Sequence, residues 1–193
     1  MPKLGMEPIR RGALIKATIS EIGRVGSLDV TVSQIARRAG MSSALAHHYF
    51  GSKDQIFQAA MRHILTTYGA QVRAALAVAD DPRARLEAII KASFEAGHFR
   101  GEVISAWLNF YVQAQSADGA RRLLNVYQKR LRSNLIHDLR PLVGDRAGAV
   151  AASIAALIDG LYIRHALGDP VSRQSPADQV LDCLDVLLQA GAK

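Results

Sequence analysis

A short polar stretch in the first third of the chain carries the side chains best suited to bind another molecule. Within seven residues that are otherwise alanine or leucine lie Ser42, Ser43, His47 and His48. Hydroxyl and imidazole groups both donate and accept hydrogen bonds, which suits the groups that DNA presents in its major groove. Adjacent histidines on a helix point in different directions, so no metal site is expected. Two exposed histidines without a binding role remain the alternative.

Two short helices joined by a tight turn are predicted to position this stretch. Thr31 can cap the first helix, because Gln34 lies three residues further on and completes a capping box. Gly40 ends that helix, since glycine adopts a positive φ without strain. Ser42 then opens a second helix that runs to about Tyr49. These lengths are typical of a helix-turn-helix that reads DNA, although short helix pairs also occur in ordinary helical proteins.

The amino-terminal end is more basic than the rest of the chain. Residues 1–64 carry a formal charge of +5, whereas the remaining two-thirds carry +2. This asymmetry favours a polyanionic partner such as nucleic acid. A membrane surface, or solubility alone, would account for the charge equally well.

The composition predicts a globular protein with a sizeable core. Of the 193 residues, 49% are hydrophobic and 21% are charged. No apolar run reaches eighteen residues and the first eleven residues are mixed in character, so we expect a cytoplasmic protein with no membrane partner. The single cysteine, Cys183, lies in an apolar helical pattern and is expected in the core.

We predict an all-α fold of about nine helices, because apolar residues recur every three to four positions and no strand pattern is evident. The expected helices cover about 8–22, 31–40, 42–49, several turns from 52, 82–99, 102–115, 118–140, 145–167 and 176–190. Ser52 is expected to cap the fourth helix with Gln55, while Pro141 and Pro170 are expected to close helices. Residues 1–64 would form the helix-turn-helix domain, including the start of the fourth helix, and residues 65–193 a ligand-binding and dimerisation domain.

The motifs around the predicted turn resemble the tetracycline-repressor family of transcriptional regulators. They are TVSQIARRAGMS at 31–42, HYF at 48–50 and SKDQI at 52–56. The resemblance implies phosphate contacts from Thr31, His48, Tyr49 and Lys53, the last at a helix amino terminus where the dipole also favours anions. It implies base-reading positions at Ser33, Ser43, Ala44, Leu45 and His47.

Further motifs resemble the choline-responsive repressors of glycine-betaine synthesis within that family. They span most of the chain and include MPKLGM at 1–6, AWL at 106–108, SNL at 133–135 and ALIDGL at 156–161. This resemblance implies a repressor whose effector is choline. A repressor of the same family with another hydrophobic or cationic effector is the alternative.

Aromatic residues and one acid are the candidate ligand contacts. They are Trp107, Phe110, Tyr111, Asp159 and Tyr162. An aromatic stripe at helical spacing is usually core, but a quaternary ammonium is held by cation–π attraction and a nearby acid. Asp159 lies in an apolar run, where its charge needs a partner: a ligand cation, Arg164 or a basic residue of a second subunit.

The last two predicted helices, 145–167 and 176–190, combine small residues with an aliphatic stripe. Such helices can approach closely, so they are candidates for a two-fold homodimer interface. A dimer would place two helix-turn-helix reading heads on the half-sites of a palindromic double-stranded operator.

The motifs of common enzymes and of nucleotide cofactor sites are absent from the sequence, so we expect neither catalysis nor a cofactor. A basic helical adaptor protein is the remaining rival class.

Overall fold

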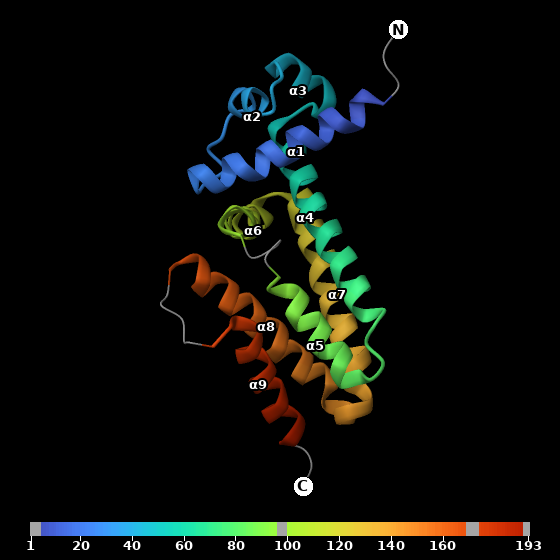
Figure 1. Cartoon of the computed structure of the whole chain (residues 1–193). Helices are drawn as coiled ribbons and strands as arrows, with labels where there is room; N and C mark the ends of the chain where they lie inside the picture. The colour runs from blue at the N-terminus through green and yellow to red at the C-terminus, as the bar shows by residue number, and fades with distance from the viewer. Residues whose placement is uncertain (1–4, 96–99, 169–173, 191–193) are drawn as a thin grey trace. The chain divides into compact units, whose positions relative to one another are not determined.

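The computed structural model describes residues 5–95, 100–168 and 174–190, and these fold entirely as helices and connecting turns (Figure 1). Within those residues the helices are α1 (Met6–Val25), α2 (Val32–Arg38), α3 (Ser43–Phe50), α4 (Lys53–Leu76), α5 (Pro82–Ser93), α6 (Gly101–Ser116), α7 (Asp118–Val143), α8 (Ala147–Ala166) and α9 (Pro176–Gln189), with one 3₁₀ turn at Gly144–Arg146. The predicted all-α fold of about nine helices is therefore confirmed.

Helix starts follow the capping residues closely. The Thr31 hydroxyl accepts from the Gln34 amide while the Gln34 side chain accepts from the Thr31 amide, so the predicted capping box is present. Ser52 and Gln55 form the same reciprocal pair at the start of α4. Ser42 caps α3 by accepting from the Leu45 amide. Local side-chain chemistry thus sets where these helices begin.

Two predicted helix ends are wrong. Pro141 lies inside α7, which continues to Val143. Pro141 lacks one helical hydrogen bond, but only two residues of α7 follow it, so the disruption is confined to the last turn. The helix expected over 82–99 ends at Ser93, whose hydroxyl bonds back to the Ile89 carbonyl before the backbone leaves the helix at Phe94. Residues 96–99, and the predicted stop at Pro170, lie outside the described residues.

Contacts divide the chain into two compact units. The first comprises Met1–Leu65 with Arg100–Leu123, and the second comprises Thr66–Phe99 with Leu124–Lys193. In the first unit α6 packs closely on α1: a Cβ at Gly23 would lie 2.5 Å from the Glu102 Cα, so only glycine fits. The domain boundary predicted after residue 64 separates a DNA-binding role from a ligand-binding role. It does not describe packing, and it stays a prediction.

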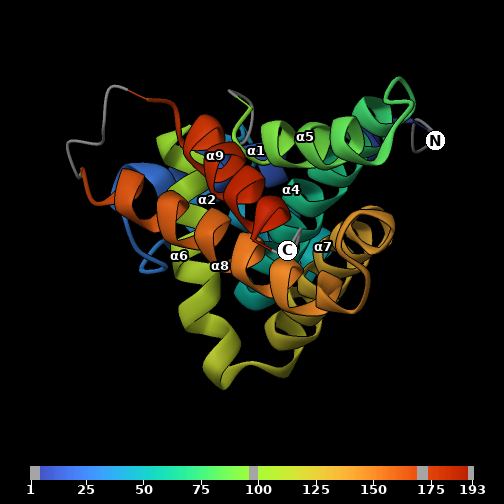
Figure 2. The same ribbon diagram turned by 90° about the horizontal axis from the view of Figure 1, so that it is seen from below.

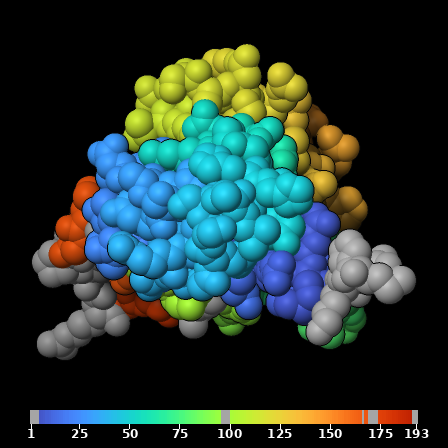
Figure 3. All heavy atoms as spheres, turned by 90° about the horizontal axis from the view of Figure 1, so that it is seen from above, coloured from blue at the N-terminus to red at the C-terminus, as the bar shows by residue number. Residues whose placement is uncertain are grey.

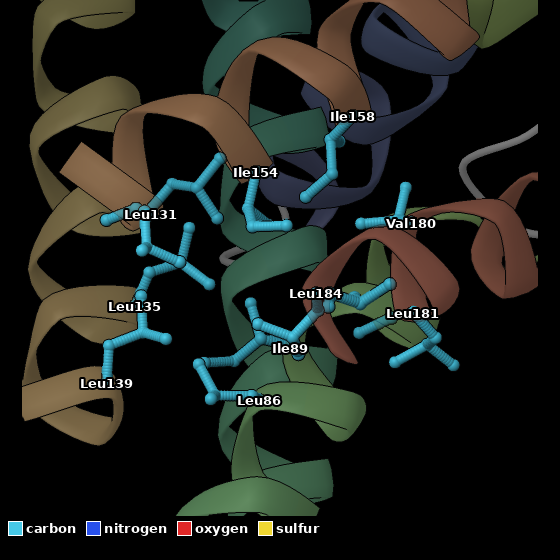
Figure 4. Packing of buried hydrophobic residues seen from close by; sticks show 14 of the residues in the cluster. Leu86, Ile89, Leu131, Leu135, Leu139, Ile154, Ile158, Val180, Leu181 and Leu184 are labelled. Carbon is cyan, nitrogen blue, oxygen red and sulfur yellow. The ribbon is translucent and has the colours of Figure 1, made fainter. Parts of the chain in front are cut away.

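The second unit is built around an aliphatic core contributed by α4, α5, α7, α8 and α9. Figure 4 shows this cluster, in which Leu135, Leu139 and Leu184 are fully buried. Figure 2 shows α9 lying along α8 and α5, where Arg83 of α5 holds Asp185 of α9 with two hydrogen bonds of 2.9 and 3.2 Å. Burial on this scale supplies the main stabilising free energy of the unit.

One stretch among the described residues, 118–165, passes a test for membrane-spanning helices by length and composition alone. The same stretch contributes Ile154 and Ile158, each buried in the core of the second unit. Apolar character here is therefore explained by packing against neighbouring helices.

Candidate nucleic-acid interface and small-molecule site

The α2–α3 pair has the geometry of a helix-turn-helix. Gly40 adopts φ +68° in the turn, as the sequence predicted. The two helices meet through small and branched side chains, with Ile35 and Ala46 fully buried and Ala36 exposing 1% of its surface. Because two of these residues are alanines, the helices can approach closely and form a rigid pair.

Most residues predicted to contact DNA lie on the surface of this pair. The exposed ones are Thr31, Ser33, Ser42, Ala44, His47 and His48, and the half-buried ones are Ser43, Leu45, Tyr49 and Lys53. Figure 3 shows the face of the first unit on which the segments of α2 and α3 are displayed. The Ser43 hydroxyl donates to the Ser33 hydroxyl at 3.0 Å, which joins two predicted base-reading residues across the helix pair. Two hydroxyls of the predicted base-reading set are therefore held together across the helix pair.

The start of α4 and the end of α3 lie next to each other in the chain and complete the surface. The Lys53 ammonium lies 5.3 Å from the centre of the Phe57 ring, a cation–π contact. This leaves a positive charge at the helix amino terminus, where the dipole also attracts anions. His47 Nδ1 lies 3.0 Å from the Gly51 carbonyl oxygen, which orients the ring of a predicted base-reading residue.

A buried carboxylate ties α1 to α2. Glu21 of α1 accepts from Arg24 at 2.8 Å and from Arg38, at the end of α2, also at 2.8 Å. Its side chain exposes only 6% of its surface. The hydrogen bond from Arg24 lowers the pKa of Glu21 most, Arg38 lowers it further, and burial acts in the opposite direction. The ion pair with Arg38 was not predicted from the sequence, because Arg38 lies 17 residues away on another helix.

Three predicted ligand contacts gather on α6. Trp107 and Phe110 expose 7% and 2% of their surfaces, and Tyr111 is half-buried. The Trp107 ring centre lies 5.8 Å from that of Tyr111 and 5.9 Å from that of Phe110. Trp107 and Tyr111, four residues apart, share one face of α6, and the three rings form one aromatic cluster in the first unit.

The second unit brings Asp159 beside aromatic residues that the sequence analysis did not select. A cavity of about 240 Å³ is lined by Asp159 of α8, by Tyr127 and Arg132 of α7, and by alanines of α8. The Tyr127 ring packs edge-on against Tyr68 of α4, with 5.8 Å between ring centres. An acid and aromatic faces therefore occur together in this unit.

The electrostatics of Tyr68 link it to Asp159. Burial raises the pKa of the Tyr68 hydroxyl most, the hydrogen bond to Ser93 at 3.1 Å lowers it, and the Asp159 carboxylate raises it. Burial also raises the pKa of Tyr162, which lies three residues after Asp159 on α8. Tyr68, Ser93 and Tyr127 come from α4, α5 and α7, so no local sequence pattern joins them to Asp159.

Taken together, an all-helical fold, a capped helix-turn-helix and a basic amino-terminal end are typical of a DNA-binding transcription regulator. Residues 14–60 match the model of the "Bacterial regulatory proteins, tetR family", and residues 82–189 match that of the "BetI-type transcriptional repressor, C-terminal". The chain belongs to the TetR family and carries the carboxyl-terminal domain of BetI-type repressors. The predictions of a transcriptional repressor and of a protein other than an enzyme are confirmed.

Similar proteins agree with this assignment over most of the chain. The "HTH-type transcriptional regulator BetI" of Brucella anthropi is 54% identical over 169 residues, 87% of each chain. The regulator of the same name from Agrobacterium fabrum is 49% identical over 192 residues, 98% of this chain and 93% of that one.

Solved structures give the same result. A putative transcriptional regulator from Pseudomonas aeruginosa is 28% identical, with a TM-score of 0.83 over 98% of this chain and 94% of that one. A putative transcriptional regulator from Saccharomonospora viridis, solved in complex with choline, is 26% identical, with a TM-score of 0.78 over 93% of this chain and 95% of that one. The roles of individual contact residues stay predictions.

Proposed function

We propose that this repressor controls genes for the synthesis of glycine betaine from choline, and that choline is its effector. The observation that carries the proposal is Asp159, a carboxylate on α8 that lines a cavity with Tyr127 and acts electrostatically on Tyr68. A quaternary ammonium donates no conventional hydrogen bond, so aromatic faces and one acid are the groups that bind it. The similarity to BetI regulators and to a choline-bound regulator supports the same ligand.

The proposed DNA contacts are those predicted from the sequence. Thr31, His48, Tyr49 and Lys53 would bind phosphates, while Ser33, Ser43, Ala44, Leu45 and His47 would meet base edges with Ser42 beside them. All of them are exposed or half-buried on the α2–α3 pair or at the start of α4, which supports contact with DNA, and the division between phosphates and bases follows the family resemblance. Residues 1–64 would therefore form the DNA-binding domain and residues 65–193 the ligand-binding and dimerisation domain.

A homodimer formed through α8 and α9 is the proposed assembly. Both helices expose apolar side chains, with Ile163 of α8 exposing 40% of its surface and Val186 of α9 exposing 64%. Packing these faces against a second copy would remove them from water and place two reading heads on a palindromic operator. We propose that the dimer acts in the cytoplasm.

Two groups of residues are proposed as ligand contacts. Asp159 and Tyr162 of α8 would act with Tyr68 and Tyr127 in the second unit. Trp107, Phe110 and Tyr111 of α6 keep the ligand role predicted from the sequence. Choline would release or weaken DNA binding only through a difference in its affinity for two conformations of the repressor.

The test is a calorimetric titration of the purified protein with choline and with 3,3-dimethylbutan-1-ol, which has the shape of choline but no charge. Choline should bind, the neutral analogue should bind at least tenfold more weakly, and Asp159→Asn should remove most of that difference. Each ligand is also added to a labelled operator complex. Equal affinity for both compounds, or an operator affinity unchanged at saturating choline, would contradict the choline assignment and favour another effector.

A further inference from the structure

The carboxyl end of α3 is held from outside its own helix. The last carbonyls of a helix have no partner within it, and each needs another donor. The Gly51 amide bonds to the His47 carbonyl. The Tyr49 carbonyl instead accepts from Arg11 Nη1 of α1 at 2.5 Å, a bond between residues 38 positions apart. Arg11 therefore joins α1 directly to the end of α3.

The same guanidinium makes a second contact one residue further along α3. Its Cζ atom lies 4.4 Å from the centre of the Phe50 ring, and Phe50 exposes only 7% of its surface. A cation at this point also complements the negative end of the α3 dipole. Contacts to a backbone oxygen and to the next side chain together fix both the rotation of the helix end and its distance from α1.

A third contact of Arg11 lies on its own helix. Glu7 Oε1 is 3.6 Å from Arg11 Nη1, and the two side chains expose 64% and 40% of their surfaces. The neighbouring Arg10 reaches the Tyr49 hydroxyl at 3.5 Å. The Arg11 guanidinium is thus directed at α3 through Tyr49 and Phe50, while Arg10 approaches the tip of the same tyrosine.

We propose that Arg11 is a positioning residue for DNA recognition, which sets the orientation of α3 by holding its carboxyl end against α1. The proposal rests on the DNA-reading role proposed for α3 and adds a residue outside the helix-turn-helix to it. Arg11 acts through Tyr49 and Phe50 rather than through the bases. Loss of this contact lets the end of α3 tilt, so base-edge hydrogen bonds, which need exact geometry, weaken before the charge attraction to phosphates does.

A direct phosphate contact by Arg11 is the competing role, and charge-preserving substitution separates the two. A lysine keeps the charge but cannot lie flat on the Phe50 ring while also bonding the Tyr49 carbonyl. If Arg11 bound phosphate, Arg11→Lys would bind DNA like the wild type. Arg11→Ala would then reduce the salt slope of binding by about 0.9 for each lost phosphate contact.

The experiment measures binding of the full-length wild type, Arg11→Lys and Arg11→Ala to an operator selected from random duplexes and to an unrelated duplex. Both variants should lose roughly tenfold in affinity for the operator, about the discrimination of one good base contact, with affinity for unrelated DNA and the salt slope unchanged. Lys16→Ala, an exposed lysine on the same helix, is the control and should bind as the wild type.

Amide hydrogen exchange gives a second measurement that does not depend on DNA. The Gly51 amide, bonded to the His47 carbonyl, should exchange at least several-fold faster in Arg11→Lys than in the wild type, while amides of α8 keep their rates. Wild-type operator affinity in Arg11→Lys, a reduced salt slope in Arg11→Ala, or unchanged Gly51 exchange would overturn the proposal. A wild type that selects no operator would instead contradict the DNA-reading role itself, and the exchange rates would still report on Arg11.

Discussion

The helix-turn-helix and the core of the second unit are stabilised in different ways. The helix-turn-helix uses short helices whose starts are fixed by side-chain caps at Thr31 and Ser42 and whose contact surface is small. The second unit uses long helices around fully buried leucines and isoleucines, joined by ion pairs such as Arg83–Asp185. A short helix gains little from its own hydrogen bonds, so caps and ties to α1 matter most in the first case and apolar burial in the second.

This difference fits the two tasks. A reading head needs exposed polar groups in a fixed geometry, and caps provide order without burying those groups. A ligand site needs a frame that holds an acid such as Asp159 beside aromatic rings, and helices packed around a large core provide that frame. Substitutions in the helix-turn-helix should therefore change DNA affinity and local order. Substitutions in the core of the second unit should change the global stability of the protein.

The largest effect is expected from Leu135→Ala in α7. Leu135 is fully buried, so the change removes apolar contacts and leaves a cavity, which costs about 2–5 kcal/mol of unfolding free energy. Urea denaturation followed by circular dichroism measures the loss. Leu142→Ala, on the same helix at a leucine that exposes 40% of its surface, is the matched control and should cost less than about 1 kcal/mol. Equal losses in the two variants would contradict the assignment of the core.

Lys53→Ala should have the next largest effect, on DNA affinity rather than on stability. Lys53 is half-buried at the start of α4 and is proposed to bind phosphate in each subunit. A dimer would lose two such contacts, so the salt slope should fall by about 1.8 and affinity for specific and unrelated DNA should fall together. Lys129→Ala, an exposed lysine of α7, is the control. An unaltered slope in Lys53→Ala would count against the phosphate role.

The two regions also differ in how much the sequence alone could predict. Every part of the helix-turn-helix lies within 31–56, so caps, the Gly40 turn and the polar positions could be predicted from neighbouring residues. The surroundings of Asp159 could not, because Tyr127, which lines the same cavity, and Tyr68, on whose hydroxyl the carboxylate acts, come from two other helices. Arg11 and Glu21 were counted only as charges, since the hydrogen-bond partners that join them to other helices, Tyr49 and Arg38, lie 38 and 17 residues away along the chain. Helix starts could be predicted from neighbouring residues. The surroundings of Asp159 and the contacts between helices depend on the tertiary fold and could not.

Thr31→Ala tests the role of caps in the reading head. The Thr31 hydroxyl accepts from the Gln34 amide, so its loss should cost about 1 kcal/mol and should speed amide exchange at the start of α2. Thr31→Ser keeps the capping oxygen and should retain most of the stability. Nuclear magnetic resonance measures the amide exchange rates of both variants, which are then compared with those of the wild type. If alanine and serine behaved alike, the cap would not be what orders α2.

The smallest effect is expected from acidification at Glu21, which joins α1 to α2. Arg24 and Arg38 lower the pKa of Glu21 in the folded protein below its ordinary value of 4.5. A carboxylate with a lowered folded-state pKa adds stability that is fully present above its unfolded-state pKa and is lost as the pH falls through the folded-state value. The unfolding free energy of the wild type should therefore decline more steeply below about pH 4.5 than that of Glu21→Gln. Denaturation curves between neutral pH and pH 3 compare the two slopes. Parallel slopes would mean that the Glu21 ion pairs do not stabilise the contact between α1 and α2, and that this part of the reading head depends on its caps and apolar seam alone.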